Sequence, residues 1–258
     1  MNFRYLKYLW KAKHRRGFGI HSPSLFYLIT NVIEENLQYY KYGLVEQVRA
    51  ILKKSGLKIN VGGKAMTLDE IIKRDCKPKH LSQMLMRLAV HYKPKNILEI
   101  GTSLGLSTMY IAAADSRSKI VTVEHEKEIA EQNVKNFKRA GFQNIEMICG
   151  DAVGELGNAL KRFDNVDMLY IDISDADKAM RVFNETKGRL AKKSFCVIGD
   201  IHESDAKEEL WEKLKEDNIV RVSLDIFDFG LLIIDDELQK EHFMLRYLPW
   251  LRNSDNAQ

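Results

Sequence analysis

The sequence predicts an α/β protein in which a helical N-terminal extension precedes a doubly wound, seven-stranded, mostly parallel sheet. From Asn96 onward, short apolar segments alternate with amphipathic segments of helical length, as expected for parallel strands joined by crossover helices. A turn containing two glycines follows the first of these strands, as in open sheets that bind a ligand there. Only a tight turn near Asp228 separates the last two strands, so we expect them to be antiparallel.

Residues 1–95 form the extension, in which the recognisable patterns are helical. Helices are expected over residues 3–16, from the Ser22 cap through Ile33, over Leu44–Ser55, from the Thr67 capping box through Ile72, and over Lys79–Tyr92. Residues 1–96 contain 19 Lys and Arg against 6 Asp and Glu, whereas the remainder contains 21 against 30. A basic amphipathic segment can lie on nucleic acid or on an anionic surface, and a docking helix with a solvated face gives the same pattern.

The segments after Asn96 define the sheet and its helices. Strands are expected over Ile97–Ile100, Lys119–Val123, Ile145–Ile148, Val166–Ile171, Phe195–Ile198, Val220–Ile226 and Gly230–Ile234. Helices are expected over Ser107–Ala114, Lys127–Ala140, Val153–Lys161, Asp177–Leu190 and Glu203–Glu216. The polar segment Arg252–Gln258 is expected to be a frayed tail.

The composition is that of an ordinary globular protein, with 45% hydrophobic and 29% charged residues among 258. No apolar run reaches the roughly 18 residues of a membrane span, and residues 1–10 lack the apolar core of a signal peptide. The cysteines, Cys76, Cys149 and Cys196, are far apart and show no metal spacing. We therefore expect a cytoplasmic location.

The turn after the first strand begins at Gly101 and ends at Gly105, where a helix starts. Glycine lets the backbone bend sharply and lets a ligand come close, and the helix start directs free N–H groups toward the turn. Glu99, just before the turn, is a carboxylate in a buried strand, which is costly unless a donor or a cation meets it. The spacing G-x-x-x-G fits a dinucleotide-binding fingerprint poorly.

Acidic residues stand at the carboxyl ends of the predicted parallel strands, which is where an open sheet binds its ligand. In chain order these residues are Glu99, Glu124, Asp151, Asp172 and Asp200. An acidic residue after a strand is commonly a helix cap, and Asp151 is also placed to cap the helix that follows it. Five in this order are hard to explain as caps, and a cleft lined by carboxylates suits a cationic ligand better than a pyrophosphate.

These residues carry a resemblance to a known family. The string E-x-G-x-x-x-G-x-S, from Glu99 to Ser107, and the acidic strand ends after it resemble motif I and later motifs of class I S-adenosylmethionine-dependent methyltransferases, which share a Rossmann-like fold. The resemblance covers residues 97–235 and implies S-adenosylmethionine as the cofactor. It also implies a helical cap over residues 1–95 and a cofactor-binding domain over residues 96–258.

The resemblance implies specific cofactor contacts. The methionine end is expected to contact Glu99, Gly101, Ser103, Gly105, Ser107 and Asp172. The ribose is expected at Glu124, and the rest of the adenosine at His125, Asp151 and Ala152. The string G-I-H-S-P, which ends at Pro23, resembles an N-terminal signature of bacterial class I methyltransferases. We therefore expect the extension to lie near the carboxyl ends of the strands, with the loop at residues 17–23 over the methyl donor.

The likeness is strongest to small-molecule O-methyltransferases of the catechol and caffeoyl-CoA type, which hold a divalent metal with two aspartates and an asparagine. Asp172 and Asp200 match the aspartates, but Ile201 stands where the asparagine would be. Two carboxylates with waters can still hold Mg²⁺, so a divalent metal is left open and no metal ligand is assigned. We expect Asp172 and Asp200 to face one another across the cleft, because both end central strands of one parallel sheet. Two such carboxylates repel unless a cation or a shared proton lies between them.

Methyl transfer to a hydroxyl of a small-molecule acceptor is the predicted function, and it is expected to survive a chelator. Asp172, Asp200 and His202 are the predicted catalytic residues, with His202 as the general base nearest the acceptor hydroxyl. Lys178 could also act as a base, but it is interpreted as a solvated helix residue.

Two other functions are kept as alternatives. The basic extension could serve the methylation of RNA or another nucleic acid, although the chain has no N/D-P-P-Y/F string and no Pro-Cys motif. Ile201 is one departure from the related methyltransferases, and Asp175, which stands where they often have a histidine, is another. Both departures also fit a protein that binds S-adenosylmethionine without catalysis. A homodimer is left open as well.

Overall fold

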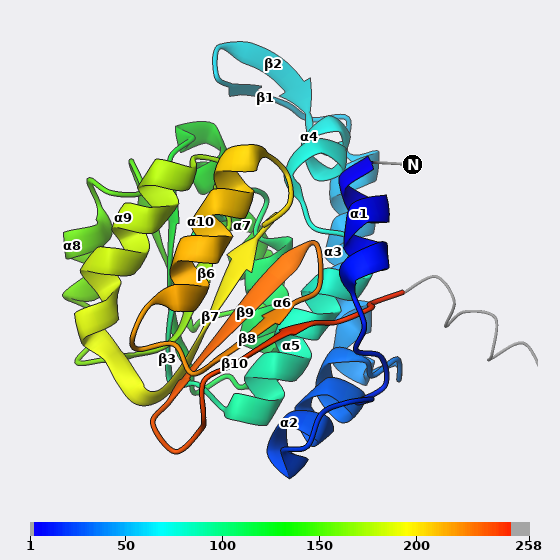
Figure 1. Ribbon diagram of the computed structural model, residues 1–258. Coiled ribbons are helices and arrows are strands. Elements are labelled where there is room, and N and C mark those ends of the chain that lie inside the picture. The colour runs from blue at the N-terminus through cyan, green and yellow to red at the C-terminus, as the bar shows by residue number, and fades with distance from the viewer. Residues whose placement is uncertain (1–2, 249–258) are drawn as a thin grey trace, which may run out of the picture.

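The computed structural model describes residues 3–248 and contains one large sheet with helices on both faces (Figure 1). The helical elements are α1 (Phe3–Lys11), α2 (Pro23–Leu28), η1 (Ile29–Ile33), α3 (Tyr40–Lys54), α4 (Leu68–Asp75), α5 (Lys79–Tyr92), α6 (Leu106–Ala114), α7 (Lys127–Arg139), α8 (Leu156–Leu160), α9 (Ala176–Thr186), η2 (Lys187–Arg189) and α10 (Asp205–Glu216). The strands are β1 (Lys58–Val61), β2 (Lys64–Thr67), β3 (Asn96–Ile100), β4 (Lys119–Glu124), β5 (Ile145–Cys149), β6 (Val166–Ile171), β7 (Leu190–Gly199), β8 (Val222–Asp225), β9 (Phe229–Asp235) and β10 (Glu241–Met244). The predicted tail, Arg252–Gln258, lies outside the described residues.

The large sheet has the order β10-β8-β9-β7-β6-β3-β4-β5. Neighbouring strands from β7 through β5 are parallel, and β9 runs antiparallel to both β7 and β8. The doubly wound, mostly parallel sheet and its final antiparallel pair are therefore confirmed. β10 adds an eighth strand that was not predicted, because it is a short edge strand that alternates weakly in burial.

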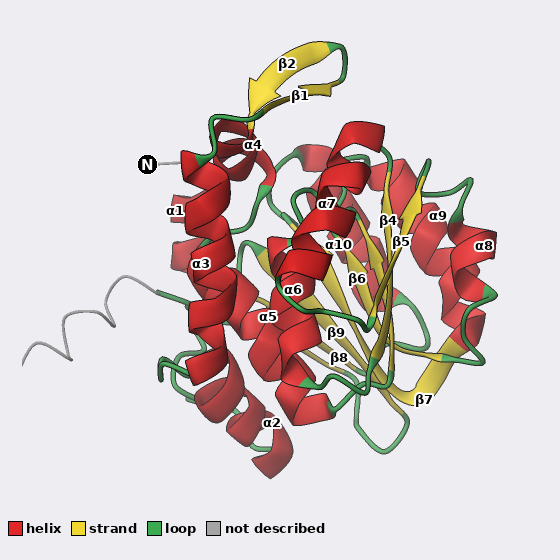
Figure 2. Ribbon diagram, turned by 180° about the vertical axis from the view of Figure 1, so that it is seen from behind, coloured by secondary structure: helices red, strands yellow, loops and turns green. Residues whose placement is uncertain are grey.

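Alternate residues of the central strands face two different cores. Leu98 and Ile100 of β3 belong to the core beneath α8, α9 and α10, whereas Ile97 faces α2 and α5. Figure 2 shows α5, α6 and α7 over this second face of the sheet. Within residues 3–248, no helix combines the length and the apolar character needed to cross a membrane.

The N-terminal extension shares its core with the sheet. Leu25 and Ile29 lie in the same buried cluster as Leu85 of α5 and Val197 of β7. Two predicted caps are present: the Ser22 side chain accepts a hydrogen bond from the Leu25 N–H, and Thr67 forms a capping box at α4. The division of the chain near residue 95 stays a prediction.

The expectation that the extension is helical throughout was wrong over residues 58–67. These residues form the antiparallel β1–β2 hairpin, which projects beyond the carboxyl ends of the sheet strands (Figure 1). Gly62 and Gly63 adopt φ values of +58° and +80°, as a two-residue turn between twisted strands requires. The predicted helix at residues 3–16 ends earlier, at Lys11, and the one at Val153–Lys161 is the shorter α8.

Candidate functional site

The turn between β3 and α6 lies where the strand order of the sheet reverses. The chain moves outward from β3 to β4 and β5, and β6 then returns to the other side of β3. The Asp172 N–H donates to the Ile100 carbonyl at 2.8 Å, which ties the ends of β6 and β3 together. Gly101 has φ of +93°, and a Cβ at this position would overlap the Asp172 carbonyl. Both the conformation and the space therefore require glycine.

Glu124 ends β4 with its carboxylate held against this turn. The carboxylate accepts hydrogen bonds from the Ser103 N–H at 2.8 Å and from the Glu126 N–H at 2.9 Å. Burial raises the pKa of Glu124, and the backbone hydrogen bonds and nearby His125 oppose that rise. Each carboxylate oxygen has a further lone pair, so Glu124 can still accept hydrogen bonds from a ligand.

Glu99 is completely buried beneath α6. One carboxylate oxygen accepts hydrogen bonds from the hydroxyls of Thr108 and Thr122, both at 2.6 Å. The other oxygen, Oε1, is buried and has no hydrogen-bond partner in the described part of the chain. Burial is the main cause that raises the pKa of Glu99 to about 8. The Glu99 carboxyl group therefore lies directly behind the glycine turn, and burial there favours its protonated form.

Asp172 and Asp200, at the ends of β6 and β7, meet at one ammonium group. The Lys77 Nζ lies 2.7 Å from Asp172 Oδ1 and also forms an ion pair with Asp200 Oδ2. The Tyr170 hydroxyl donates to Asp172 Oδ2 at 2.7 Å. The prediction that the two aspartates face one another, with a cation or a proton between them, is confirmed, and the cation is Lys77.

These groups border a single cleft of about 790 Å³ at the carboxyl ends of the strands. Gly101, Ser103 and Glu124 lie along one part of the cleft, and Asp172 and Asp200 lie along another. Ligand pockets in proteins commonly span roughly 300–1,000 Å³. The cleft is therefore large enough for a cofactor and a small acceptor.

The β1–β2 hairpin and the segment after α4 close one side of the cleft. Val61, Gly62 and Lys64 of the hairpin line it. Two carboxylates near the start of α7 hold the hairpin: Glu126 accepts from the Gly62 N–H at 2.9 Å and Glu128 from the Asn60 N–H at 2.7 Å. The N-terminal extension thus reaches the carboxyl ends of the strands through this hairpin.

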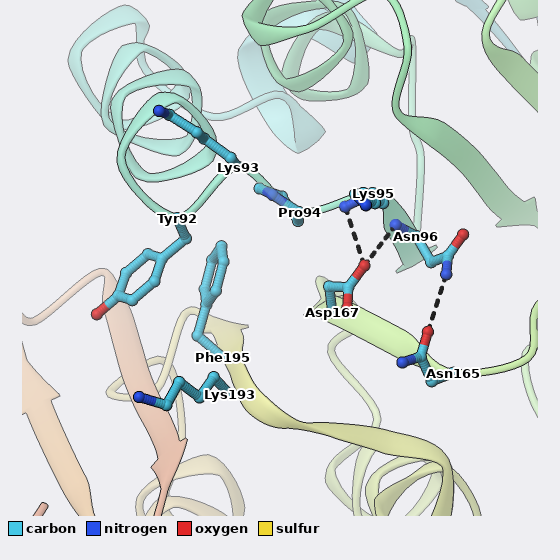
Figure 3. Close-up of a pocket in the computed structure, with 9 residues that line it drawn as sticks. All are labelled: Tyr92, Lys93, Pro94, Lys95, Asn96, Asn165, Asp167, Lys193 and Phe195. Atoms are coloured by element: carbon cyan, nitrogen blue, oxygen red, sulfur yellow. Dashed lines mark hydrogen bonds between the residues drawn. The ribbon is translucent and has the colours of Figure 1, made fainter. Parts of the chain in front are cut away.

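A second pocket, of about 400 Å³, lies at the opposite ends of the strands, between Tyr92 and Asn165 (Figure 3). Asp167 accepts hydrogen bonds there from the Lys95 and Asn96 N–H groups at 2.9 and 2.8 Å. Its polar groups are thus used to fasten the link between α5 and β3. We therefore assign no chemistry to this pocket.

Comparison with known proteins agrees with this geometry. A family model described as a methyltransferase domain matches residues 98–201, which run from β3 to the end of β7. Residues 98–201, about two fifths of the chain, thus match a methyltransferase domain. A solved O-methyltransferase from Bacillus cereus, in complex with SAH, has the same fold: its TM-score is 0.62 at 18% identity, over 80% of this chain and 96% of that one.

The curated relatives of the methyltransferase domain act on different acceptors, as their names state. A protein-L-isoaspartate O-methyltransferase from Methanococcus aeolicus is 29% identical over 53% of this chain and 59% of its own length. A catechol O-methyltransferase from Mycobacterium tuberculosis is 31% identical over 46% and 53%. A ribosomal RNA small subunit methyltransferase G from Brachyspira hyodysenteriae is 28% identical over 54% and 62%. The chain thus spans little more than half the length of these relatives.

Several residues predicted for the cofactor surround the cleft of the methyltransferase domain. Gly101, Ser103, Glu124, His125 and Asp172 line it directly. Glu99 lies behind the turn, as described above. The glycine lets a ligand come close to the backbone, and the carboxylates can accept hydrogen bonds from hydroxyl and ammonium groups. These residues therefore fit S-adenosylmethionine. Their individual contacts with the cofactor stay predictions.

Other predicted residues do not line the cleft. Gly105 is the N-cap residue of α6, and the Ser107 hydroxyl lies 3.2 Å from that of Ser82. Asp151 caps the turn at Val153 and forms an ion pair with Lys178. Asp151 therefore acts here as a cap, and its role at the adenine, with that of neighbouring Ala152, stays a prediction.

His202 lies outside the cleft, between α10 and β8. Its ring nitrogens lie 3.0 Å from Glu208 and 2.9 Å from Asp225, and the ring stacks on Phe227. Burial lowers the pKa of His202, but the two carboxylates outweigh burial and raise the pKa overall. An imidazolium held by two carboxylates is poorly suited to act as a base, so the predicted role of His202 has no support here.

The loop at residues 17–23 does not cover the methyl donor. Gly17 packs against Phe26, and Ile20 is buried in the core shared with α5. None of these residues lines the cleft. The prediction was wrong because the chain passes down the edge of the sheet before α2 (Figure 1), and the hairpin at residues 58–67 takes the covering position.

Sequence reasoning missed Lys77 entirely. Lys77 lies in the short link between α4 and α5, where a lysine before a proline ordinarily reads as a solvated loop residue. Here it is 7% exposed and reaches a carboxylate 123 positions later in the chain. The available signal was the pair of facing aspartates, which required a cation.

Proposed function

We propose that this protein transfers a methyl group from S-adenosylmethionine to a hydroxyl of a small molecule. The observation that carries the proposal is one continuous cleft that joins the glycine turn and Glu124 to the Asp172–Lys77–Asp200 cluster. One end of the cleft has the groups that a nucleoside needs, and the other end has charged groups suited to a polar acceptor.

The cofactor occupies the part of the cleft beside Gly101 and Glu124. Bound S-adenosylmethionine would supply a methyl group carried on a sulfonium sulfur. The acceptor oxygen would form a bond to the methyl carbon as the carbon–sulfur bond breaks, and the sulfur would leave as a thioether. Glu124 accepts the ribose hydroxyls, and the missing Cβ of Gly101 admits the cofactor close to the backbone. The β1–β2 hairpin borders the cleft, and Glu126 and Glu128 hold it in place.

The acceptor occupies the part of the cleft beside Asp200. The Asp200 carboxylate is 42% exposed and can take the proton that the hydroxyl loses, before releasing it to solvent. Alignment of the oxygen with the methyl group provides most of the acceleration expected for such a displacement. Asp200 is therefore the proposed base in place of His202.

The test is an assay of the full chain with S-adenosylmethionine and a panel of phenols, alcohols and carboxylic acids. Methylated products are identified by mass, and S-adenosylhomocysteine is measured as the second product. Asp200→Asn should reduce turnover by about 10²–10⁴-fold if Asp200 is the base, and Asp164→Asn, on an exposed loop, is the control. Binding of S-adenosylhomocysteine without turnover on any acceptor would favour a non-catalytic cofactor-binding protein.

Methylation of a nucleic acid is the second candidate. Lys64, Lys73 and Arg74 line the cleft mouth and are exposed there, which favours an acceptor that carries an anionic group. The same assay therefore includes ribosomal RNA and transfer RNA. Methylation of RNA together with inactivity on all small hydroxylated molecules would replace the first candidate by the second.

A cytoplasmic location is part of the proposal. Cys76, Cys149 and Cys196 are all free, which fits a reducing compartment. Cell fractionation tests this part independently of the activity.

A further inference from the structure

Lys77 is built into the site as a fixed internal cation. Its side chain is 7% exposed, although lysine is rarely buried without a partner. The link between α4 and α5 brings the amine to the ends of β6 and β7, where it contacts Asp172 and Asp200 together. Pro78, the next residue, begins the approach to α5 and limits the freedom of this link.

The electrostatics require a cation at this point. Asp172 is 14% exposed, and the Tyr170 hydroxyl already holds its second oxygen. Two carboxylates this close repel one another unless a positive charge lies between them. Burial lowers the pKa of Lys77, but attraction to Asp172 and Asp200 outweighs burial and raises the pKa above its ordinary value. The amine therefore stays protonated at neutral pH.

A divalent metal does not fit the same position. The Lys77 amine already lies between the two carboxylates, and Ile201, which follows Asp200, is fully buried and has no donor atom. Among residues 3–248, no group of three His, Cys, Asp or Glu side chains is arranged to hold a metal ion. Mg²⁺ needs six oxygen ligands in near-octahedral geometry. The site departs in this respect from the metal-dependent enzymes that the sequence resembles.

We propose that the Lys77 ammonium replaces a divalent cation in this protein, and that it contacts one oxygen of the acceptor. An ammonium has three N–H donors, and Asp172 and Asp200 take two of them. The remaining donor can meet a single oxygen, whereas a metal with two open positions can chelate a vicinal pair. The acceptor is thus a molecule with an isolated hydroxyl. This part rests on the proposed function, but replacement of the metal does not.

Removal of the Lys77 amine should uncover a metal site. We would titrate the full chain with Mn²⁺ and follow free Mn²⁺ by electron paramagnetic resonance. The wild type should bind no Mn²⁺ at this site up to about 1 mM. Lys77→Ala should bind one equivalent, with a Kd at least about tenfold below that concentration. Adding Asp200→Asn to Lys77→Ala should abolish the gain. Lys73→Ala is the matched control, since this cleft lysine pairs with Asp69 and should gain nothing.

Two results would overturn the proposal. One is stoichiometric Mn²⁺ binding by the wild type that Asp200→Asn removes. The other is a folded Lys77→Ala that gains no binding; Lys77→Ser takes its place if the alanine variant does not fold, as judged by circular dichroism. Calorimetry with S-adenosylhomocysteine, run on the same wild-type sample, keeps the two proposals separate. If the wild type does not bind S-adenosylhomocysteine, the proposed function is contradicted, but the conclusion from Mn²⁺ binding is unaffected.

Discussion

Gly101 lies so close to the Asp172 carbonyl that one added methyl group would overlap it. This contact joins the end of β3 to the end of β6, which Asp172 follows. The sharp bend at φ of +93° brings the turn over the strand end and leaves the cleft open. The glycine is therefore a structural requirement of the site and also a means of close approach for a ligand.

Gly101→Ala should lower the free energy of unfolding and weaken cofactor binding together. The unfavourable backbone conformation alone should cost about 1–3 kcal/mol, and the overlap with Asp172 adds to that cost. Urea unfolding and calorimetry with S-adenosylhomocysteine provide the two measurements. Gly157→Ala is the control, because Gly157 lies in α8 with open space around its Cα, and alanine should be tolerated there. Equal stability of both variants would show that the turn can relax around a side chain.

Glu126 and Glu128 should govern the mobility of the β1–β2 hairpin. Each accepts a hydrogen bond from a hairpin N–H, and bonds to charged groups contribute about 1.5–3 kcal/mol. The double variant Glu126→Ala/Glu128→Ala should raise amide exchange across residues 58–67 at least about tenfold. Exchange in β3 and β6 should stay unchanged. If the amides of the hairpin exchange at the same rates in the double variant and in the wild type, packing alone holds the hairpin.

Glu99 should make stability depend on pH. The pKa of Glu99 is raised to about 8 in the folded protein. At pH values between the ordinary pKa of a glutamate and this value, the folded state therefore binds one more proton than the unfolded chain. The stabilisation is complete below the pKa of the unfolded chain, and it is lost as pH rises through the folded value. Between these values the free energy of unfolding should fall by at most about 1.4 kcal/mol per pH unit.

Glu99→Gln removes this proton and keeps an acceptor for Thr108 and Thr122. Urea unfolding at about pH 5, 6 and 7 should therefore give a flatter pH profile for Glu99→Gln than for the wild type. Glu131→Gln, on the exposed surface of α7, should keep the wild-type slope. Parallel profiles in all three proteins would indicate that Glu99 is ionised when folded, with its free oxygen hydrated.

The sequence was sufficient to predict the sheet and the strand-end groups, because these depend on local pattern. The apolar segments that contain Ile97 and Val121 identify buried strands, and the glycine turn after β3 predicts a ligand site. The β1–β2 hairpin was also readable from Gly62-Gly63 between two short alternating segments, and this signal was overlooked. The edge strand β10 gave no comparable pattern.

The acceptor side could not be predicted in the same way. Lys77 acts through contacts with residues far along the chain, and no local pattern distinguishes it from a solvated lysine. His202 followed an acidic strand end and matched the expectation for a base, but its side chain turns toward Asp225 and Glu208. Side-chain direction after a strand depends on the neighbouring helix, here α10, and this tertiary information is absent from the spacing.

The most direct test of the central claim is calorimetry of S-adenosylhomocysteine binding to the wild type, Glu124→Ala and Glu131→Ala. Loss of a carboxylate that accepts both ribose hydroxyls should cost about 1.5–3 kcal/mol, or roughly 10–150-fold in Kd. The wild type and Glu131→Ala should bind equally. No binding by the folded wild type, or the same affinity in Glu124→Ala as in the other two proteins, would contradict a cofactor site at the end of β4.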